Sequence, residues 1–93
     1  MNLRQIHHVA IIVSDYKKSR KFYVETLGFQ IIRENYRPSR GDYKLDLKLE
    51  GCELELFSAS GNPPRPSYPE ACGLRHLAFR VDDVDAAIAE LRE

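Results

Sequence analysis

The chain has 93 residues, with 14 basic and 14 acidic side chains, a formal net charge of zero and 43% hydrophobic residues. This length fits one small domain. The balanced charge argues against an electrostatic nucleic-acid binder, and no apolar run approaches the roughly 20 residues of a membrane span. MNLRQIHH lacks the apolar core of a signal peptide. The two cysteines form no C-x-x-C and no disulfide framework, so we expect a protein of the reducing cytoplasm.

The first part of the chain predicts a strand, a helix and three further strands. Residues 5–13 are apolar and β-branched, which is typical of a buried strand. Asp15 offers a side-chain oxygen as the N-cap of a helix, and Gly28 is a natural helix end. Phe29–Tyr36 predicts a second strand. The stretches KLDLKL and CELELF alternate apolar and polar residues, with a hairpin turn at Glu50-Gly51 between them.

The second part begins with a proline-rich segment and then repeats the start of the chain. SASGNPPRPSYPEACG contains four of the five prolines, which predicts a spacer, with a polyproline ligand as the alternative. LRHLAFRV, Leu74–Val81, aligns with IHHVAIIV and predicts another strand, with His76 in the place of His8. Asp83 predicts the N-cap of a following helix. The first unit has three strands after its helix, whereas the second has none.

Strand alternation collects polar side chains on one face of the predicted sheet. His8, His76, Glu53 and Glu55 are expected on the concave face, opposite the apolar residues that pack on the helix. Imidazole and carboxylate are the ligands that ions such as Zn²⁺ or Ni²⁺ accept. We interpret Glu53 as a solvated residue at the rim and His7 as a hydrogen-bonded strand residue.

The stretches IHHVAIIVSDYKKSRKFYVETLGF, ELELF and GLRHLAFRVDDVDAAIAEL resemble the vicinal oxygen chelate superfamily, and in particular its small bacterial glyoxalase-I-like members. This resemblance implies an α+β fold of paired βαβββ modules. Residues 1–93 would form one such domain, with a complete first module at 4–59 and a proline-rich linker at 60–73. Residues 74–93 would begin a second module that contains only a strand and a helix.

The resemblance also implies a metal centre and a reaction. The ligands would be His8, Glu55 and His76, holding nickel or zinc, with iron, manganese and cobalt as alternatives. Glu55 would then be the catalytic base of a lactoylglutathione-lyase-like enzyme. Such an enzyme isomerises a 2-oxoaldehyde–thiol adduct to a 2-hydroxyacyl thioester through proton abstraction and a metal-stabilised enediolate.

Two positions depart from the pattern of the family. The chain ends before the glutamate that is usually the fourth ligand, so it is either a truncated form or completed by a partner, and we expect a homodimer or a strand-exchanged oligomer. Ile12 stands where glutathione-dependent members usually have an arginine that holds a carboxylate. Arg80 occupies the equivalent place in the second unit and is the candidate substrate-binding residue, with a structural ion pair as the alternative.

Two other functions remain open from the sequence. The same cup without a metal would bind a drug or another small hydrophobic molecule, with Tyr36, Tyr43, Phe57 and Tyr68 as candidate lining residues. Two histidines and one carboxylate would also satisfy the ligand count of an iron-dependent dioxygenase.

Overall fold

The computed structural model describes residues 1–92 and contains one sheet with two helical segments. In these residues no helix is long and apolar enough to cross a membrane. The elements, in chain order, are β1 (His8–Ile12), α1 (Tyr16–Lys21), η1 (Phe22–Thr26), β2 (Gln30–Arg37), β3 (Asp42–Leu49), β4 (Cys52–Ala59) and α2 (Val84–Leu91).

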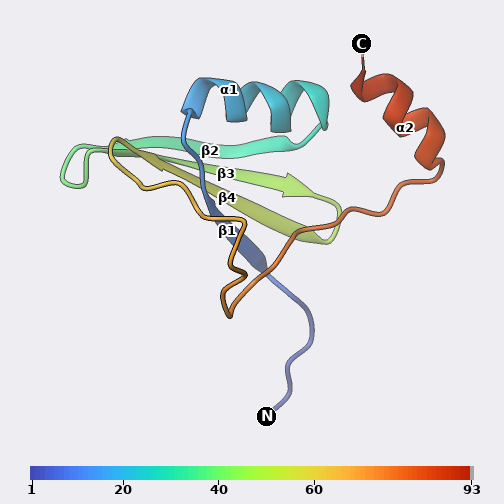
Figure 1. Ribbon diagram of the computed structural model, residues 1–93, viewed down its shortest axis with the longest axis horizontal. Helices are drawn as coiled ribbons and strands as arrows, with labels where there is room; N and C mark the ends of the chain where they lie inside the picture. Colours follow the sequence, from blue (N-terminus) through green and yellow to red (C-terminus); the bar gives the residue numbers. More distant parts are fainter. Residues whose placement is uncertain (93) are drawn as a thin grey trace.

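The four strands form a sheet in the order β1-β4-β3-β2. β1 pairs parallel to β4, whereas β4 with β3 and β3 with β2 are antiparallel. The helical segment after β1 supplies the crossover that a parallel pair requires. Figure 1 shows this segment along one face of the sheet. This arrangement is the predicted βαβββ module.

The core lies between the sheet and the helical segment. Leu45, Leu47 and Leu56 are fully buried, and Leu54 is 3% exposed. In the register of the sheet, Leu45 lies opposite Leu56 and Leu47 opposite Leu54, so the four side chains form one apolar layer. Each buried side chain of this size contributes about 1.5–3 kcal/mol relative to an exposed one. The face predicted to be apolar is therefore the face that packs on the helix.

The first helix begins and ends at the predicted residues. The Asp15 side chain accepts a hydrogen bond from the backbone N–H of Lys18, at 3.1 Å. The last turn, η1, is a π-helical turn, in which the Leu27 N–H donates to the carbonyl of Phe22 five residues earlier. Gly28 follows with φ of +82°, a conformation that glycine adopts without the strain of a Cβ atom.

The strand predicted at Leu74–Val81 is wrong: these residues have no regular secondary structure. A strand is stabilised by a hydrogen-bonded neighbour, and the described sheet contains only β1 to β4. Phe79 nevertheless packs edge to face on Phe29, with ring centroids 5.7 Å apart. The helix that follows is confirmed, because the Asp83 side chain accepts a hydrogen bond from the Ala86 N–H at the start of α2.

Candidate metal and proton-transfer site

Two predicted site residues lie together on the open face of the sheet. His8 comes from the edge strand β1 and Glu55 from its neighbour β4, and the His8 Nε2 atom is 3.6 Å from a Glu55 carboxylate oxygen. Parallel pairing places Ala10 opposite Glu55 and His8 opposite Glu53. The His8 side chain is 43% exposed and that of Glu55 18%, so the pair is accessible from solvent.

A second histidine–carboxylate pair lies beside the first. His7 Nε2 is 3.9 Å from a Glu53 carboxylate oxygen, and this pair is more exposed than the first. The Nδ1 atoms of His7 and His8 are 2.9 Å apart, so one ring donates its proton and the other accepts it. The predicted hydrogen bond of His7 is confirmed, but His7 is not a strand residue, because β1 begins at His8. The shared hydrogen bond also constrains the orientation and the tautomer of the His8 ring.

Two charged residues of β3 that the sequence analysis did not select complete this face. Lys44 Nζ lies 3.4 Å from Asp46 Oδ1 and 3.9 Å from Glu55 Oε1, so one ammonium group lies between two carboxylates. Asp46 is opposite Glu55 in the register, and Arg33 contacts its other oxygen at 2.8 Å. The alternation of KLDLKL could have revealed both residues, because it turns Lys44 and Asp46 away from the leucine face.

Asp46 is the one charged side chain on this face that is nearly removed from water. Its side chain is only 3% exposed, and its Oδ1 atom is buried without a hydrogen-bond partner in the described part of the chain. A buried carboxylate oxygen without a hydrogen bond is costly.

His76 and Arg80 belong to the segment that forms no strand. Within residues 1–92, no three histidine, cysteine, aspartate or glutamate side chains are close enough to hold one metal ion. The structure therefore brings His8 and Glu55 together but does not add His76. His76 instead lines a cavity of about 360 Å³ in the proline-rich segment, with Arg65 and Glu70 among its neighbours. Arg80 is exposed.

The chemistry and spacing of His8 and Glu55 fit two positions of a divalent ion. Zinc binds imidazole nitrogen and carboxylate oxygen at about 2.1 Å, so two ligands of a tetrahedral ion lie about 3.4 Å apart. The observed 3.6 Å between the two side chains is close to that separation. The pair supplies two ligands, and a complete site needs at least one more donor.

Comparison with known proteins identifies a family and several relatives of this chain. Residues 5–93 match the family model described as the Glyoxalase/Bleomycin resistance protein/Dioxygenase superfamily. YwkD of Bacillus subtilis is 58% identical over 94 residues, covering 100% of this chain and 73% of YwkD. The crystal structure of a glyoxalase family protein from Enterococcus faecalis is 55% identical with a TM-score of 0.91, covering 99% of this chain and 73% of that one.

More distant relatives carry names with different activities. The trypanothione-dependent glyoxalase I of Leishmania major is 30% identical with a TM-score of 0.73, over 97% of this chain and 66% of that one. The human mitochondrial methylmalonyl-CoA epimerase is 30% identical, and the match spans 99% of this chain but 54% of the epimerase. TnmS3, an antibiotic binding protein from Streptomyces sp. CB03234, is 32% identical with a TM-score of 0.65, over 99% and 71%.

Proposed function

The chain belongs to the Glyoxalase/Bleomycin resistance protein/Dioxygenase superfamily, and we propose that within it the protein is a glyoxalase-I-like, metal-dependent carbon–sulfur lyase. Its substrate would be the adduct of a 2-oxoaldehyde with a thiol, and its product a 2-hydroxyacyl thioester. The observation that carries this proposal is the His8–Glu55 pair on the open face of the sheet, 3.6 Å apart. The similarity to the Leishmania major glyoxalase I supports the same reaction.

Three residues have a role in this proposal. His8, Glu55 and His76 would hold a divalent ion, nickel or zinc, which would supply Lewis-acid stabilisation of the negative charge that develops as a proton leaves carbon. Glu55 removes that proton and returns it to the adjacent carbon, a contribution of about 10²–10⁴-fold to the rate.

Lys44 and Asp46 position the base in this scheme. The Lys44 ammonium group is 3.9 Å from Glu55 and 3.4 Å from Asp46, so it links the two carboxylates across the β3–β4 ladder. The charge of the ammonium group attracts the Glu55 carboxylate and restricts its orientation. Lys44 and Asp46 are therefore positioning residues, and Glu55 is the catalytic residue.

The proposal also includes a cellular compartment and binding partners. Both Cys52 and Cys72 are free thiols, which suits a cytoplasmic protein in a reducing compartment. The partner is a small molecule, and a second copy of the chain is the expected source of the donors that this chain does not bring to His8 and Glu55.

Calorimetric titration of the metal-stripped protein with Ni²⁺ and Zn²⁺ tests the proposal. We expect one ion per chain in the unaltered protein and loss of binding in His8→Ala, Glu55→Gln and His76→Ala. Glu53→Gln is the matched control, because Glu53 lies on the same strand and the same face but pairs with His7. Conversion of methylglyoxal with several thiols is then followed by the absorbance of the thioester.

The result depends on a difference between two carboxylates of β4. Loss of binding and of turnover in Glu55→Gln, with both retained in Glu53→Gln, would support the lyase. Equal ion binding in the unaltered protein, His8→Ala and Glu55→Gln would show that the pair is not a metal site. Unaltered binding in His76→Ala alone would remove His76 from the ligand set.

A metal-free binding protein is the second candidate function. The likeness to TnmS3 favours it, as does the finding that three potential ligands are not grouped in residues 1–92. In that case a hydrophobic ligand would lie on the open face near Phe57, and its binding would survive treatment with a chelator. Loss of ligand binding on chelation would favour the lyase.

A further inference from the structure

The two histidine–carboxylate pairs on the open face are joined by one hydrogen bond. The Nδ1 atoms of His7 and His8 lie 2.9 Å apart, and the two rings meet edge to face with centroids 5.1 Å apart. The other nitrogen of each ring lies near a carboxylate. His8 Nε2 is 3.6 Å from Glu55, and His7 Nε2 is 3.9 Å from Glu53. A carboxylate, two imidazoles and a second carboxylate therefore form one continuous row.

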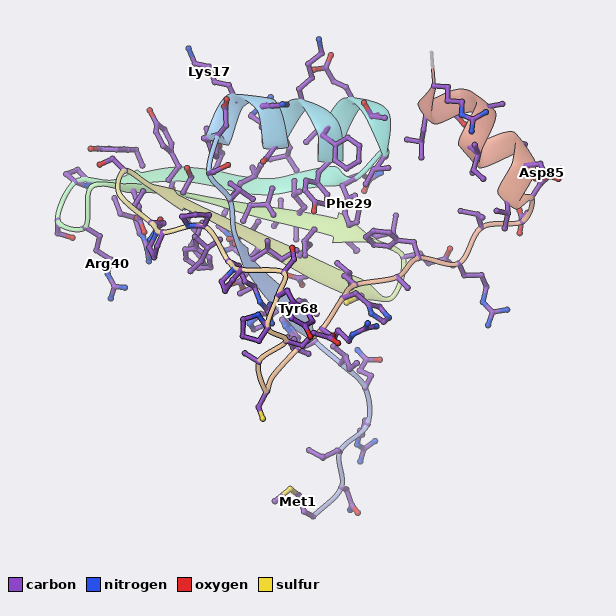
Figure 2. All side chains as sticks on the ribbon, in the orientation of Figure 1. Met1, Lys17, Phe29, Arg40, Tyr68 and Asp85 are labelled. Atoms are coloured by element: carbon purple, nitrogen blue, oxygen red, sulfur yellow. The ribbon has the colours of Figure 1, made fainter. Side chains whose placement is uncertain are left out.

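The backbone holds this row together although His7 precedes β1. The Glu53 N–H donates to the His7 carbonyl at 3.0 Å, and His8 lies opposite Glu53 in the β1–β4 register. Figure 2 shows the segment before β1 running away from the sheet to Met1. His7 thus stands where the chain joins the sheet, with a side chain that is 73% exposed. Its ring is oriented by the contact with His8 rather than by burial.

Two arrangements of the ring protons satisfy this hydrogen bond. A neutral imidazole has one N–H donor and one acceptor nitrogen. If His7 Nδ1 donates, His8 carries its own proton on Nε2, beside Glu55, and the Nε2 atom of His7 is bare. If His8 Nδ1 donates instead, the Nε2 atom of His8 is bare, and His7 carries its proton on Nε2, beside Glu53. The two rings hold opposite tautomers in either arrangement.

Only the second arrangement suits a metal ligand. A histidine binds a metal through a nitrogen without a proton, and Nε2 is the His8 nitrogen that lies beside Glu55. The His8 proton must then be on Nδ1, and His7 Nδ1 is the acceptor that lies within hydrogen-bond distance. Histidine ligands almost always donate this proton to a neighbouring acceptor, which fixes the ring and raises the basicity of the ligand nitrogen.

The two carboxylates favour opposite arrangements. Glu55 stabilises a proton on His8 Nε2, whereas Glu53 stabilises a proton on His7 Nε2. Exchange between the arrangements moves the shared proton from His7 Nδ1 to His8 Nδ1, while water carries the Nε2 proton of His8 to His7 Nε2. The pair gains and loses no net proton, so the exchange changes tautomers and leaves the charge constant.

We propose that His7 is the positioning residue of the metal site and that His7 and His8 change tautomer together. His7 accepts the Nδ1 proton of His8 and leaves the Nε2 atom of His8 free for the ion. The inference rests on the proposed function for the identity of the ion site, but the coupling of the two rings does not require an ion.

Nitrogen-15 NMR of the imidazole rings in the metal-stripped protein tests the coupling, at about pH 8.5, where imidazole is ordinarily neutral. Protonated and bare ring nitrogens have well-separated shifts, so each tautomer is read directly. We expect opposite tautomers in His7 and His8. Glu55→Gln should move the His8 proton towards Nδ1 and the His7 proton towards Nε2, and Glu53→Gln should do the reverse. His76 is the internal control and should not change. The same tautomer on both rings, or a change in one ring alone, would overturn the inference.

Titration with Zn²⁺ tests the consequence for the metal site. In His7→Ala we expect the affinity to fall about tenfold, the lower end of the range for partners of metal ligands, because the His7 side chain is exposed. His7→Asn is the conservative variant, since its side-chain oxygen takes the place of Nδ1 and accepts the same proton, and it should restore the affinity. Unfolding curves establish that both variants retain the fold. An unchanged affinity in His7→Ala, or an equal loss in His7→Asn, would show that His7 does not position His8.

The two proposals fail separately. If no variant of His8 or Glu55 changes the binding of Zn²⁺, while the tautomers of His7 and His8 stay opposite and shift together, the coupling stands and the metal site falls. If His8→Ala abolishes the binding of Zn²⁺ and His7→Ala binds it normally, the metal site stands and the role of His7 is wrong.

Discussion

Replacing Asp46 by asparagine tests whether this buried carboxylate serves the site or the fold. Asp46 lies on the central strand β3 with a side chain that is 3% exposed, next to the fully buried Leu45 and Leu47. Its Oδ2 atom forms an ion pair with Arg33 at 2.8 Å, whereas its Oδ1 atom has only the Lys44 ammonium group at 3.4 Å. Asparagine keeps the size of the side chain and removes its charge.

The opposing contributions to stability nearly cancel. The ion pair with Arg33 contributes at most about 1 kcal/mol, because the Arg33 side chain is 62% exposed and such pairs contribute about 0–1 kcal/mol. Neutralising a buried oxygen without a hydrogen bond returns about 1–3 kcal/mol of desolvation cost, less what the new amide group requires. We expect Asp46→Asn to stay within about 1 kcal/mol of the unaltered protein.

Urea unfolding followed by circular dichroism measures the difference, with Leu47→Ala as the comparison on the same strand. Leu47 is fully buried, so its truncation should cost about 2–5 kcal/mol. In a separate thermal unfolding experiment, the Tm of Leu47→Ala should fall by more than about 8 °C, since 1 kcal/mol corresponds to about 4–8 °C for a domain of this size. Asp46→Asn should nevertheless reduce turnover, because Lys44 loses one of its two anchors. A loss of stability as large as that of Leu47→Ala, or unchanged turnover, would refute this account of Asp46.

Three further outcomes follow from particular contacts. The hydrogen bonds from Arg20 and then Tyr16 lower the pKa of Glu34 below its ordinary value of about 4.5. The stability that these bonds provide is therefore present above that pH and is lost as the pH falls through the lowered pKa. The urea midpoint should fall less steeply between about pH 5 and 2 in Glu34→Gln than in the unaltered protein, and identical slopes would contradict this. Gly28→Ala should lower the unfolding free energy by about 1–2 kcal/mol, because φ is +82° with open space around a Cβ, and an unchanged Tm would contradict it. Sedimentation velocity should detect a dimer that Ile88→Lys weakens, because Ile88 is 42% exposed on an apolar stripe of α2; a monomer at every concentration would exclude the dimer.

The sequence predicted the first module because local patterns and tertiary packing agree there. Alternation in KLDLKL and CELELF placed Leu45, Leu47, Leu54 and Leu56 on one face, and all four are buried. The segment 74–81 has the same pattern of residues as β1, but it pairs with no strand of the described sheet. A pattern states which residues would share a face, whereas a strand also requires a neighbour that accepts and donates its backbone hydrogen bonds.

The same distinction explains which site residues were found. Alternation was sufficient to bring His8 and Glu55 to one face of two paired strands, 3.6 Å apart. The roles of Lys44 and Asp46 depend on the cross-strand register, because Asp46 lies opposite Glu55 only through the β3–β4 pairing. The spacing of residues within one segment does not determine this register.

Two of the proposed metal ligands lie on paired strands, whereas the third lies in a segment without a strand partner. His8 and Glu55 stand on strands joined by a ladder, so their separation is set before any ion binds. His76 lies in a segment without regular structure, and ordering such backbone costs about 1–2 kcal/mol per residue. The cost of this ordering would reduce the net free energy of metal binding, so metal affinity would be linked to the local folding of this segment. A partner that pairs with residues 74–81 should then raise metal affinity without contributing a ligand, by supplying the neighbouring strand that this segment lacks.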